Sequence, residues 1–300
     1  REEHDVLRGQ VLKFGASEHH GNELVSFLPR PELTAADVVL PDGRLRAIEA
    51  HVVGIAEHAR QLLAAGQHLK RGLLLHGPPG TGKTHTVRYL MSRLTDSTVI
   101  QLTGPAMRFL DTAVALARRL NPSVVIVEDV DLVAEDREIT DGGNPLLFSL
   151  LDAMDGVAGD ADVVFMLTTN RVRALERALA ERPGRVDLAV EIPRPDSEGR
   201  LRLLRLYGQE LRLEADLAAV AARTEGVTAS FVKELVRRAV LVALREGPSV
   251  EVLTDAHFGV ALEEMFDQAQ SLTRGLLGAA SDPSGSGPSD GIEEDVADNR

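Results

Sequence analysis

Three features of the sequence predict an α/β fold, with a parallel sheet followed by a smaller helical domain. Short apolar runs alternate with helical segments between residues 45 and 195, and each run is continuous enough for a strand buried on both faces. Strand signals end at about Pro195. Beyond that point, apolar residues follow the period of amphipathic helices. Together these features indicate one sheet domain and one helical domain.

The predicted elements follow one another along the chain. Helical spacing of apolar side chains predicts a helix over residues 45–63, and another is expected over residues 83–94. Buried strands are expected within residues 71–77, 97–104, 122–129, 162–170 and 188–196. Helices of the second domain are expected within residues 197–211, 214–224, 228–247 and 254–270. Thr254 is the expected N-cap of the last one.

Composition divides the chain into four predicted segments. Residues 1–30 indicate a strand-rich remnant of an N-terminal region or a linker, and the initial Arg1 suggests that an upstream portion was removed. Residues 31–195 form the α/β domain, and residues 196–277 form the helical domain. Residues 278–300 are rich in Ser, Gly, Pro and acids, which predicts a disordered acidic tail.

Composition also limits the class of protein. The chain has no cysteine, no signal-peptide pattern and no apolar run long enough to span a membrane. We therefore predict a cytoplasmic location and no membrane segment. The net charge of −13 argues against a general nucleic-acid surface.

A glycine-rich loop follows the first predicted strand and opens a helix. The stretch GPPGTGKT has the spacing of a phosphate-binding loop, in which backbone N–H groups cradle phosphate oxygens. Lys83 would place its charge on the β- and γ-phosphates, and the Thr84 hydroxyl would ligate Mg²⁺. A Gly/Pro turn that merely precedes a helix is the alternative. The candidate binding residues are Gly77, Pro78, Pro79, Gly80, Thr81, Gly82, Lys83, Thr84 and His85.

The stretch KRGLLLHGPPGTGKT resembles the AAA+ ATPases, specifically the classical AAA clade. The resemblance continues to about residue 265 and implies a P-loop ATPase domain with a helical lid. It implies ATP or ADP and Mg²⁺ as cofactors, and hydrolysis of ATP to ADP and phosphate. It also implies a homo-oligomeric ring, expected to be a hexamer, that remodels, unfolds or chaperones an unknown protein partner.

Two acids follow the strand SVVIV, at the sheet edge where ligands gather in parallel sheets. In the family an Asp holds the metal and a following Glu polarises the attacking water. Here the order is reversed, as in the mitochondrial Rieske-protein translocase branch, so Glu128 falls on the metal position and Asp129 on the water position. A pair of acids that cap the next helix is the plain alternative.

The reversed order leaves two functions open, because a misplacement of about 1 Å can lower a rate about 10²-fold. One is an active ATPase, and the other is a nucleotide-binding switch or scaffold with very slow hydrolysis. A nucleic-acid motor or loader is a third alternative, which the acidic composition weakens.

Further positions match the family's catalytic set. Asn170 ends the strand VVFMLTT and matches the polar sensor near the γ-phosphate, although an Asn after a strand is also a common turn residue. RPGRVD resembles the arginine-finger region, so Arg182 and Arg185 would reach the γ-phosphate of a neighbouring subunit. A pair of surface arginines is the alternative.

The resemblance fails at one loop. Members that thread their substrate carry an aromatic-apolar-Gly loop after the second strand, but here the connection is short and lacks an aromatic-x-Gly. Arg108 and Phe109 are the nearest candidates for a pore surface. Threading of unfolded polypeptide is therefore in doubt.

Overall fold

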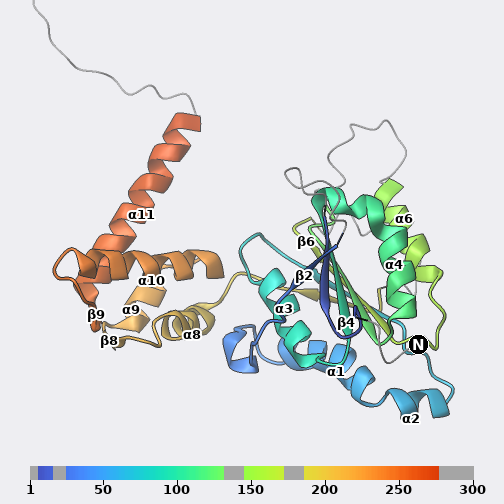
Figure 1. Cartoon of the computed structure of the whole chain (residues 1–300). Helices are drawn as coiled ribbons and strands as arrows, with labels where there is room; N and C mark the ends of the chain where they lie inside the picture. The colour runs from blue at the N-terminus through green and yellow to red at the C-terminus, as the bar shows by residue number, and fades with distance from the viewer. Residues whose placement is uncertain (1–5, 16–24, 132–144, 172–185, 277–300) are drawn as a thin grey trace, which may run out of the picture.

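The structure is a computed structural model that describes residues 6–15, 25–131, 145–171 and 186–276. It consists of a sheet domain and a helical domain joined by one chain segment (Figure 1). The main sheet has seven strands in the order β2-β1-β4-β5-β6-β3-β7. All neighbouring strands pair in parallel except β1 and β2, which are antiparallel. The predicted α/β class is confirmed.

The strands of this sheet are β1 (Val11–Phe14), β2 (Val25–Leu28), β3 (Arg71–His76), β4 (Thr98–Thr103), β5 (Ser123–Glu128), β6 (Val163–Thr169) and β7 (Leu188–Glu191). The helices of the same domain are α1 (Arg44–Glu57), α2 (Ala59–Ala64), α3 (Lys83–Arg93), α4 (Leu110–Arg119) and α6 (Pro145–Asp155). The described part of this domain also contains the 3₁₀ turns η1 (Ala35–Asp37) and η2 (Gly104–Phe109).

Helices cover both faces of the sheet, as its continuous apolar strands require. One core layer lies between the sheet and α4 with α6, and the other lies between the sheet and α1 with α3 (Figure 1). Along β5, Val125 and Val127 enter the first layer, while Val124 and Ile126 enter the second. The two-residue period of the strand therefore supplies both cores.

The N-terminal segment is part of the sheet. We expected residues 1–30 to be a strand-rich remnant of an N-terminal region or a linker, and within them β1 pairs with β4 and β2 pairs with β1. Arg30 fixes the exit from β2, because its guanidinium donates hydrogen bonds to the carbonyl oxygens of Gly9, Met91, Leu94 and Ser97. The α/β layer thus begins before residue 31.

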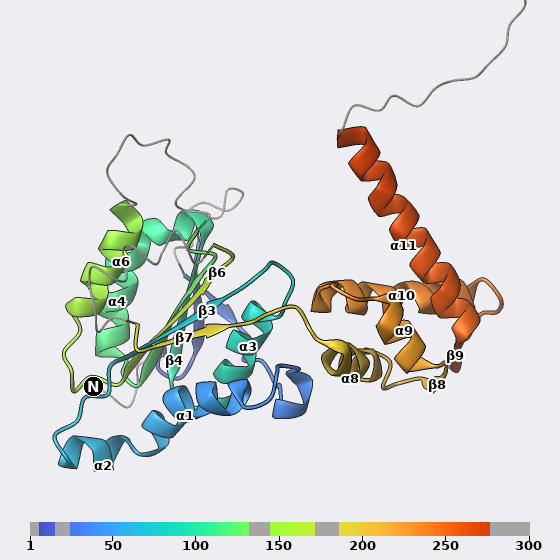
Figure 2. The ribbon, with the colours of Figure 1, turned by 180° about the vertical axis from the view of Figure 1, so that it is seen from behind.

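The C-terminal domain contains α8 (Ser197–Tyr207), α9 (Leu217–Arg223), α10 (Ala229–Leu244) and α11 (Asp255–Leu276). Figure 2 shows the chain passing from β7 into α8. The prediction that no strand follows Pro195 is wrong, because β8 (Arg212–Glu214) and β9 (Val252–Thr254) form a parallel pair. These strands have three residues each, which is too short for a recognisable apolar run.

Among the described residues, no helix has both the length and the apolar character to cross a membrane.

The parallel order sets the place of the site. β5, β6 and β3 are neighbours, so their carboxyl ends meet at one sheet edge. The loop after β3, the acids at the end of β5 and the asparagine after β6 are all attached to that edge. Residues far apart in sequence are thereby brought together, as at ligand sites of other parallel sheets.

A buried arginine connects α1 to the start of two of these strands. The side chain of Arg71 is 2% exposed, and burial lowers its pKa against the opposing effect of Asp162. Its guanidinium donates to the carbonyl oxygens of Val52 and Leu69 and lies 2.7 Å from the Asp162 carboxylate. Every one of these acceptors would lose a donor if the side chain were removed.

We predict that Arg71→Ala lowers the free energy of unfolding by about 3 kcal/mol, since a buried pair is broken by removal of one partner. The control is Arg212→Ala, whose side chain is 71% exposed and pairs with Glu214. This exposed pair should contribute less than about 1 kcal/mol. Urea denaturation of both variants measures the difference, and equal effects would contradict the assigned role of Arg71.

Candidate functional site

The loop between β3 and α3 depends on glycine at points of close approach. Gly77 has φ 145°, and a Cβ there would lie 2.2 Å from the carbonyl oxygen of Ile192. Gly80 has φ 75°, and its Cβ would lie 3.1 Å from the Ser230 hydroxyl oxygen. The backbone N–H of Ser230 also donates to the Gly80 carbonyl at 3.0 Å. The loop is therefore held between the sheet and the start of α10.

Lys83 begins α3 with its ammonium turned back to the loop. Its Nζ donates to the carbonyl oxygens of Gly77 and Pro78, both at 2.9 Å, and to Oδ1 of Asn170 at 2.8 Å. Burial lowers the pKa of Lys83, while the negative charges of Asp129 and Asp131 oppose that shift. A cation is thus fixed at the mouth of the loop, where phosphate oxygens could replace its carbonyl partners.

Glu128 ends β5 and lies next to the first turn of α3. Burial raises the pKa of Glu128, the neighbouring Asp129 raises it further, and the Thr84 side chain opposes both effects. Hydroxyl and carboxylate oxygens are ligands that Mg²⁺ accepts together with water and phosphate. The two residues that the sequence assigns to the metal therefore lie near each other.

Asp129 leaves the strand in a left-handed conformation, with φ 49°. Asp is one of the few residue types that adopt this conformation readily. Its backbone N–H donates to the Thr168 hydroxyl at 3.0 Å, and its Oδ1 accepts from Nδ2 of Asn170 at 3.2 Å. The amide of Asn170 therefore bridges Lys83 and Asp129, accepting from the first and donating to the second.

Lys83, Asp129 and Asn170 line a cavity of about 390 Å³, within the range of small-molecule sites, whereas Glu128 is not part of its lining. A second cavity, of about 200 Å³, lies between the two domains and includes Val39, Thr81 and Leu203. The first cavity is lined by Pro79, Gly80, Gly82, Lys83, Thr84, His85, Arg88, Asp129, Asn170 and Ser230. The shape of the loop, the cation and the oxygen pair all fit a nucleotide phosphate with Mg²⁺.

The remaining predicted residues have different positions. His85 reaches this cavity, although its Nε2 is hydrogen-bonded to the carbonyl oxygen of Asp37 at 2.9 Å. The Thr81 hydroxyl donates to the Pro78 carbonyl within the loop. Arg182 and Arg185 lie outside the described residues.

Sequence reasoning missed three residues that the structure places at the site. Arg88 follows Thr84 by one helical turn and lines the same cavity, which helical spacing could have indicated. Ser230 joins it from α10. Asp131 is buried behind the cavity and bonds the end of β6, a contact that no local pattern reveals.

Comparison with known proteins gives a family match for the sheet domain. Residues 73–194 match the profile of the ATPase family associated with various cellular activities, AAA. The resemblance inferred from the sequence is confirmed at that level. The likeness of the Glu–Asp order to one branch of the family stays a prediction.

Several curated proteins are also similar to this chain. The proteasome-activating nucleotidase of Methanosphaerula palustris is 33% identical over 200 residues, which are 62% of this chain and 48% of that protein. The ATP-dependent zinc metalloprotease FtsH of Synechococcus is 31% identical over 251 residues, 79% of this chain and 38% of that protein. The proteasome-activating nucleotidase of Pyrococcus furiosus is 31% identical over 262 residues, which are 83% of this chain and 65% of that protein. The aligned parts therefore cover less than two thirds of these relatives.

We predict that Lys83→Met abolishes the rise in melting temperature produced by ADP with Mg²⁺. A ligand at 100 times its Kd stabilises the native state by about 2.7 kcal/mol, which is a shift of several degrees. The unliganded melting temperature should change by less than about 4 °C, because Met removes the desolvated charge together with its hydrogen bonds. The control is Lys233→Met, on an exposed face of α10. A Lys83→Met protein whose melting temperature still rises fully with ADP and Mg²⁺ would contradict the placement of the phosphates beside Lys83.

Proposed function

The chain contains an ATPase domain of the AAA family, whose members bind ATP or ADP with Mg²⁺ and hydrolyse ATP, and from this premise we propose that it uses hydrolysis in a homo-oligomeric ring to remodel a protein partner. The observation that carries the proposal is the bridge from Lys83 through Asn170 to Asp129. Lys83 and Asp129 line the same cavity, which supports our assignment of the first to phosphate and of the second to water.

We assign each residue a role in this reaction. The N–H groups of the loop and the ammonium of Lys83 hold the β- and γ-phosphates. Thr84 and Glu128 hold Mg²⁺, which when bound neutralises charge on the phosphate oxygens. Asp129 orients the attacking water and accepts its proton, and Asn170 positions the same water.

The backbone supports the reversed order of the acids. The position after Glu128 has φ 49°, which a longer and less tolerant side chain would adopt at a cost. Asp129 is one methylene shorter than the usual Glu, but its carboxylate already lies beside Asn170 on the cavity. We therefore propose that Asp129 activates the attacking water from this backbone position, and that the reversed order of the acids does not abolish hydrolysis.

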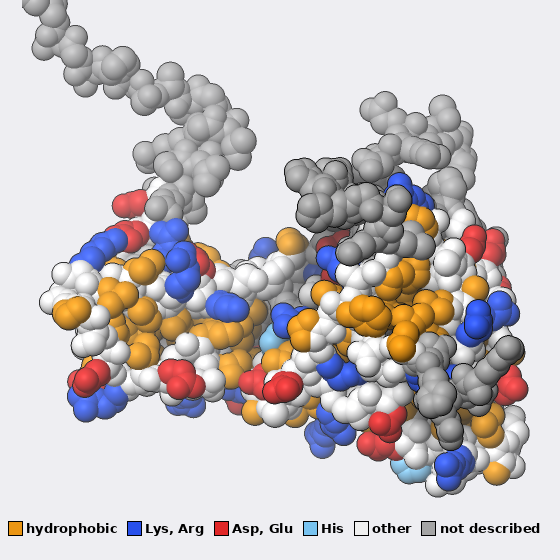
Figure 3. Space-filling view, in the orientation of Figure 1, with side chains coloured by type: hydrophobic (Ala, Val, Ile, Leu, Met, Phe, Trp, Pro, Cys, Tyr) orange, Lys and Arg blue, Asp and Glu red, His pale blue; other side chains and the backbone are white. Residues whose placement is uncertain are grey.

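The alternative is a nucleotide-binding switch or scaffold that hydrolyses ATP very slowly. It would follow if Asp129 did not reach the attacking water, because a general base must lie within hydrogen-bonding reach of its proton. A nucleic-acid motor has less support. Figure 3 shows Lys and Arg side chains dispersed among acidic ones on the visible face, without a continuous basic stripe on its described part.

The proposed ring has a protein as its partner. The relatives include a proteasome-activating nucleotidase and an ATP-dependent metalloprotease, and both names point to proteins that act on other proteins. We propose a hexamer in which Arg182 and Arg185 stabilise the transferring phosphate of the neighbouring copy. The cytoplasmic location stays a prediction from the sequence.

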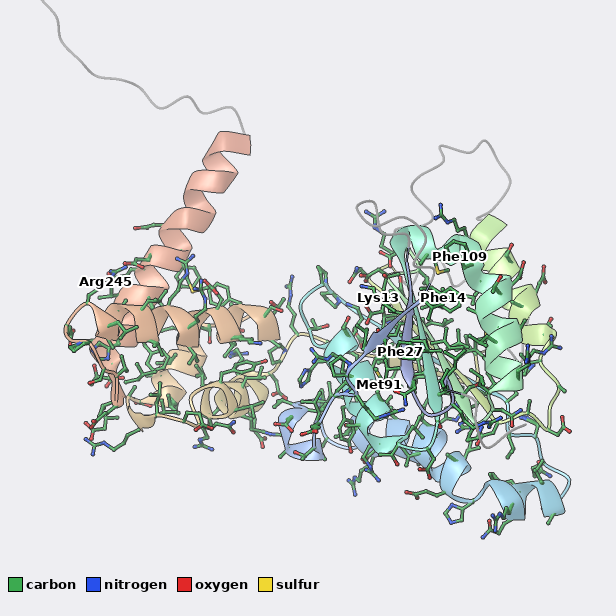
Figure 4. The ribbon with its side chains drawn as sticks, in the orientation of Figure 1. Lys13, Phe14, Phe27, Met91, Phe109 and Arg245 are labelled. Carbon is green, nitrogen blue, oxygen red and sulfur yellow. The ribbon has the colours of Figure 1, made fainter. Side chains whose placement is uncertain are left out.

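The partner is proposed to be remodelled without an aromatic pore loop. Phe109 is half-buried, with its ring centroid 6.2 Å from that of Phe14 on β1, and the two lie together in Figure 4. The guanidinium of Arg108 lies 4.7 Å from the Phe109 ring. The aromatic side chain nearest to the expected pore position therefore packs on the sheet.

We predict that Asp129→Asn lowers kcat for ATP at least about 10²-fold, because the general base is lost. The affinity for ADP with Mg²⁺ should change less than about 3-fold, since an amide keeps the size of the carboxylate and phosphate contacts are untouched. Steady-state phosphate release and a binding titration measure the two quantities. Asp160→Asn, at an exposed turn, is the control.

The exchange of both acids separates the two candidate functions. For a working ATPase, the double variant Glu128→Asp with Asp129→Glu should gain no activity, because Glu is strained in the left-handed position. A rise in kcat of about 10-fold or more would favour the slow switch, since it would mean that the native acids are misplaced.

A further inference from the structure

The carboxylate of Asp131 is buried at the end of β5, with 4% of the residue exposed. Its Oδ1 accepts two hydrogen bonds from the end of β6, from the Thr169 hydroxyl at 2.9 Å and from the backbone N–H of Asn170 at 3.0 Å. Burial of a carboxylate is costly unless such bonds replace its hydration. Both of these bonds are made to the segment that carries the site's asparagine.

These bonds complete a connection between two strand ends. Just before them, the N–H groups of Asp129 and Val130 donate to the hydroxyl and the carbonyl oxygen of Thr168, each at 3.0 Å. The pairing of β5 with β6 ends at Val127, so the connection continues beyond the regular sheet. It fixes the backbone at Asn170 relative to the backbone at Asp129.

The side chain of Asn170 can hold its two charged partners only from a fixed backbone. Its amide must lie 2.8 Å from Lys83 Nζ and 3.2 Å from Asp129 Oδ1 at the same time. Misplacement by about 1 Å would break one of these bonds and can lower a rate about 10²-fold. The residue that holds the Asn170 backbone therefore controls the geometry of both groups.

The negative charge of Asp131 also stabilises the charged form of Lys83. It opposes the effect of burial on the pKa of Lys83 and so supports the ammonium form. Asp131 is not among the residues that line the cavity. Its influence on a bound nucleotide would therefore pass through Asn170 and Lys83.

We propose that Asp131 is a positioning residue for ATP hydrolysis, which aims the amide of Asn170 at Lys83 and Asp129 through the paired ends of β5 and β6. This rests on the proposed function. Asp131 does not touch substrate, and it acts on the rate of the chemical step more than on nucleotide binding.

The first test compares Asp131→Ala with Asp131→Asn. The alanine variant should lose about 10- to 100-fold in kcat, with a change of less than about 3-fold in KM for ATP. The asparagine variant keeps an oxygen that can accept both bonds, so it should regain most of the lost activity. Arg71→Ala is the control, because it removes a buried charged side chain outside the site. A loss of kcat in this control equal to that of Asp131→Ala would assign the effect to general destabilisation.

A double-mutant cycle tests the route through Asn170. If Asp131 acts through that amide, the loss in Asp131→Ala combined with Asn170→Ala should hardly exceed the loss in Asn170→Ala alone. Additive losses would overturn the proposal. If the alanine variant does not fold, Thr169→Val takes its place, because it removes one of the two donors to Asp131, together with the acceptor of the Arg171 N–H.

A spectroscopic test does not depend on turnover. The chain has five asparagines, so selective ¹⁵N labelling gives few side-chain amide signals, and Asn170→Ala identifies the one that matters. In Asp131→Ala this signal should shift and broaden, and in Asp131→Asn it should stay near its wild-type position. An unchanged signal in Asp131→Ala would overturn the inference. If the variants show these signal changes but the wild-type protein does not turn over ATP, the proposed function alone would be overturned.

Discussion

The site depends on one hydrogen-bonded bridge, in which the side chain of Asn170 joins the ammonium of Lys83 to the carboxylate of Asp129. The bridge brings together three chain segments, the start of α3 and the ends of β5 and β6. Opposite charges are held close in a partly buried place, where their interaction is stronger than in water. The glycine-rich loop and the cavity that it lines, together with Thr84, are arranged around this bridge.

The fold makes this bridge possible because β5, β6 and β3 are parallel neighbours with apolar cores on both faces. The sheet core carries the free energy of folding, so the edge can hold groups that are costly to bury. The C-terminal domain is joined to the same edge, since the N–H of Ser230 donates to the carbonyl of Gly80. Gly80 therefore offers one route by which a change at the phosphates would reach the helical domain.

The sequence predicted the parts of this arrangement that have local patterns. Apolar runs located the central strands, and glycine spacing located the loop with Lys83. Pairing between distant segments was not predictable in the same way. Strand β1 has four residues and pairs with β4 far along the chain, and Asp131 meets Thr169 only after β5 and β6 are aligned. The left-handed turn at Asp129 likewise depends on tertiary bonds to Thr168, which no propensity encodes.

The most direct test of the account is a structure of the chain with Mg²⁺ and a non-hydrolysable ATP analogue. We predict that Lys83 exchanges the carbonyl oxygens of Gly77 and Pro78 for phosphate oxygens, while the Asn170 backbone stays bonded to Asp131. We also predict the metal beside Thr84 and Glu128, with Asp129 facing the γ-phosphate. A metal bound by Asp129 instead, or phosphates bound away from a Lys83 that keeps its loop carbonyls, would contradict the account.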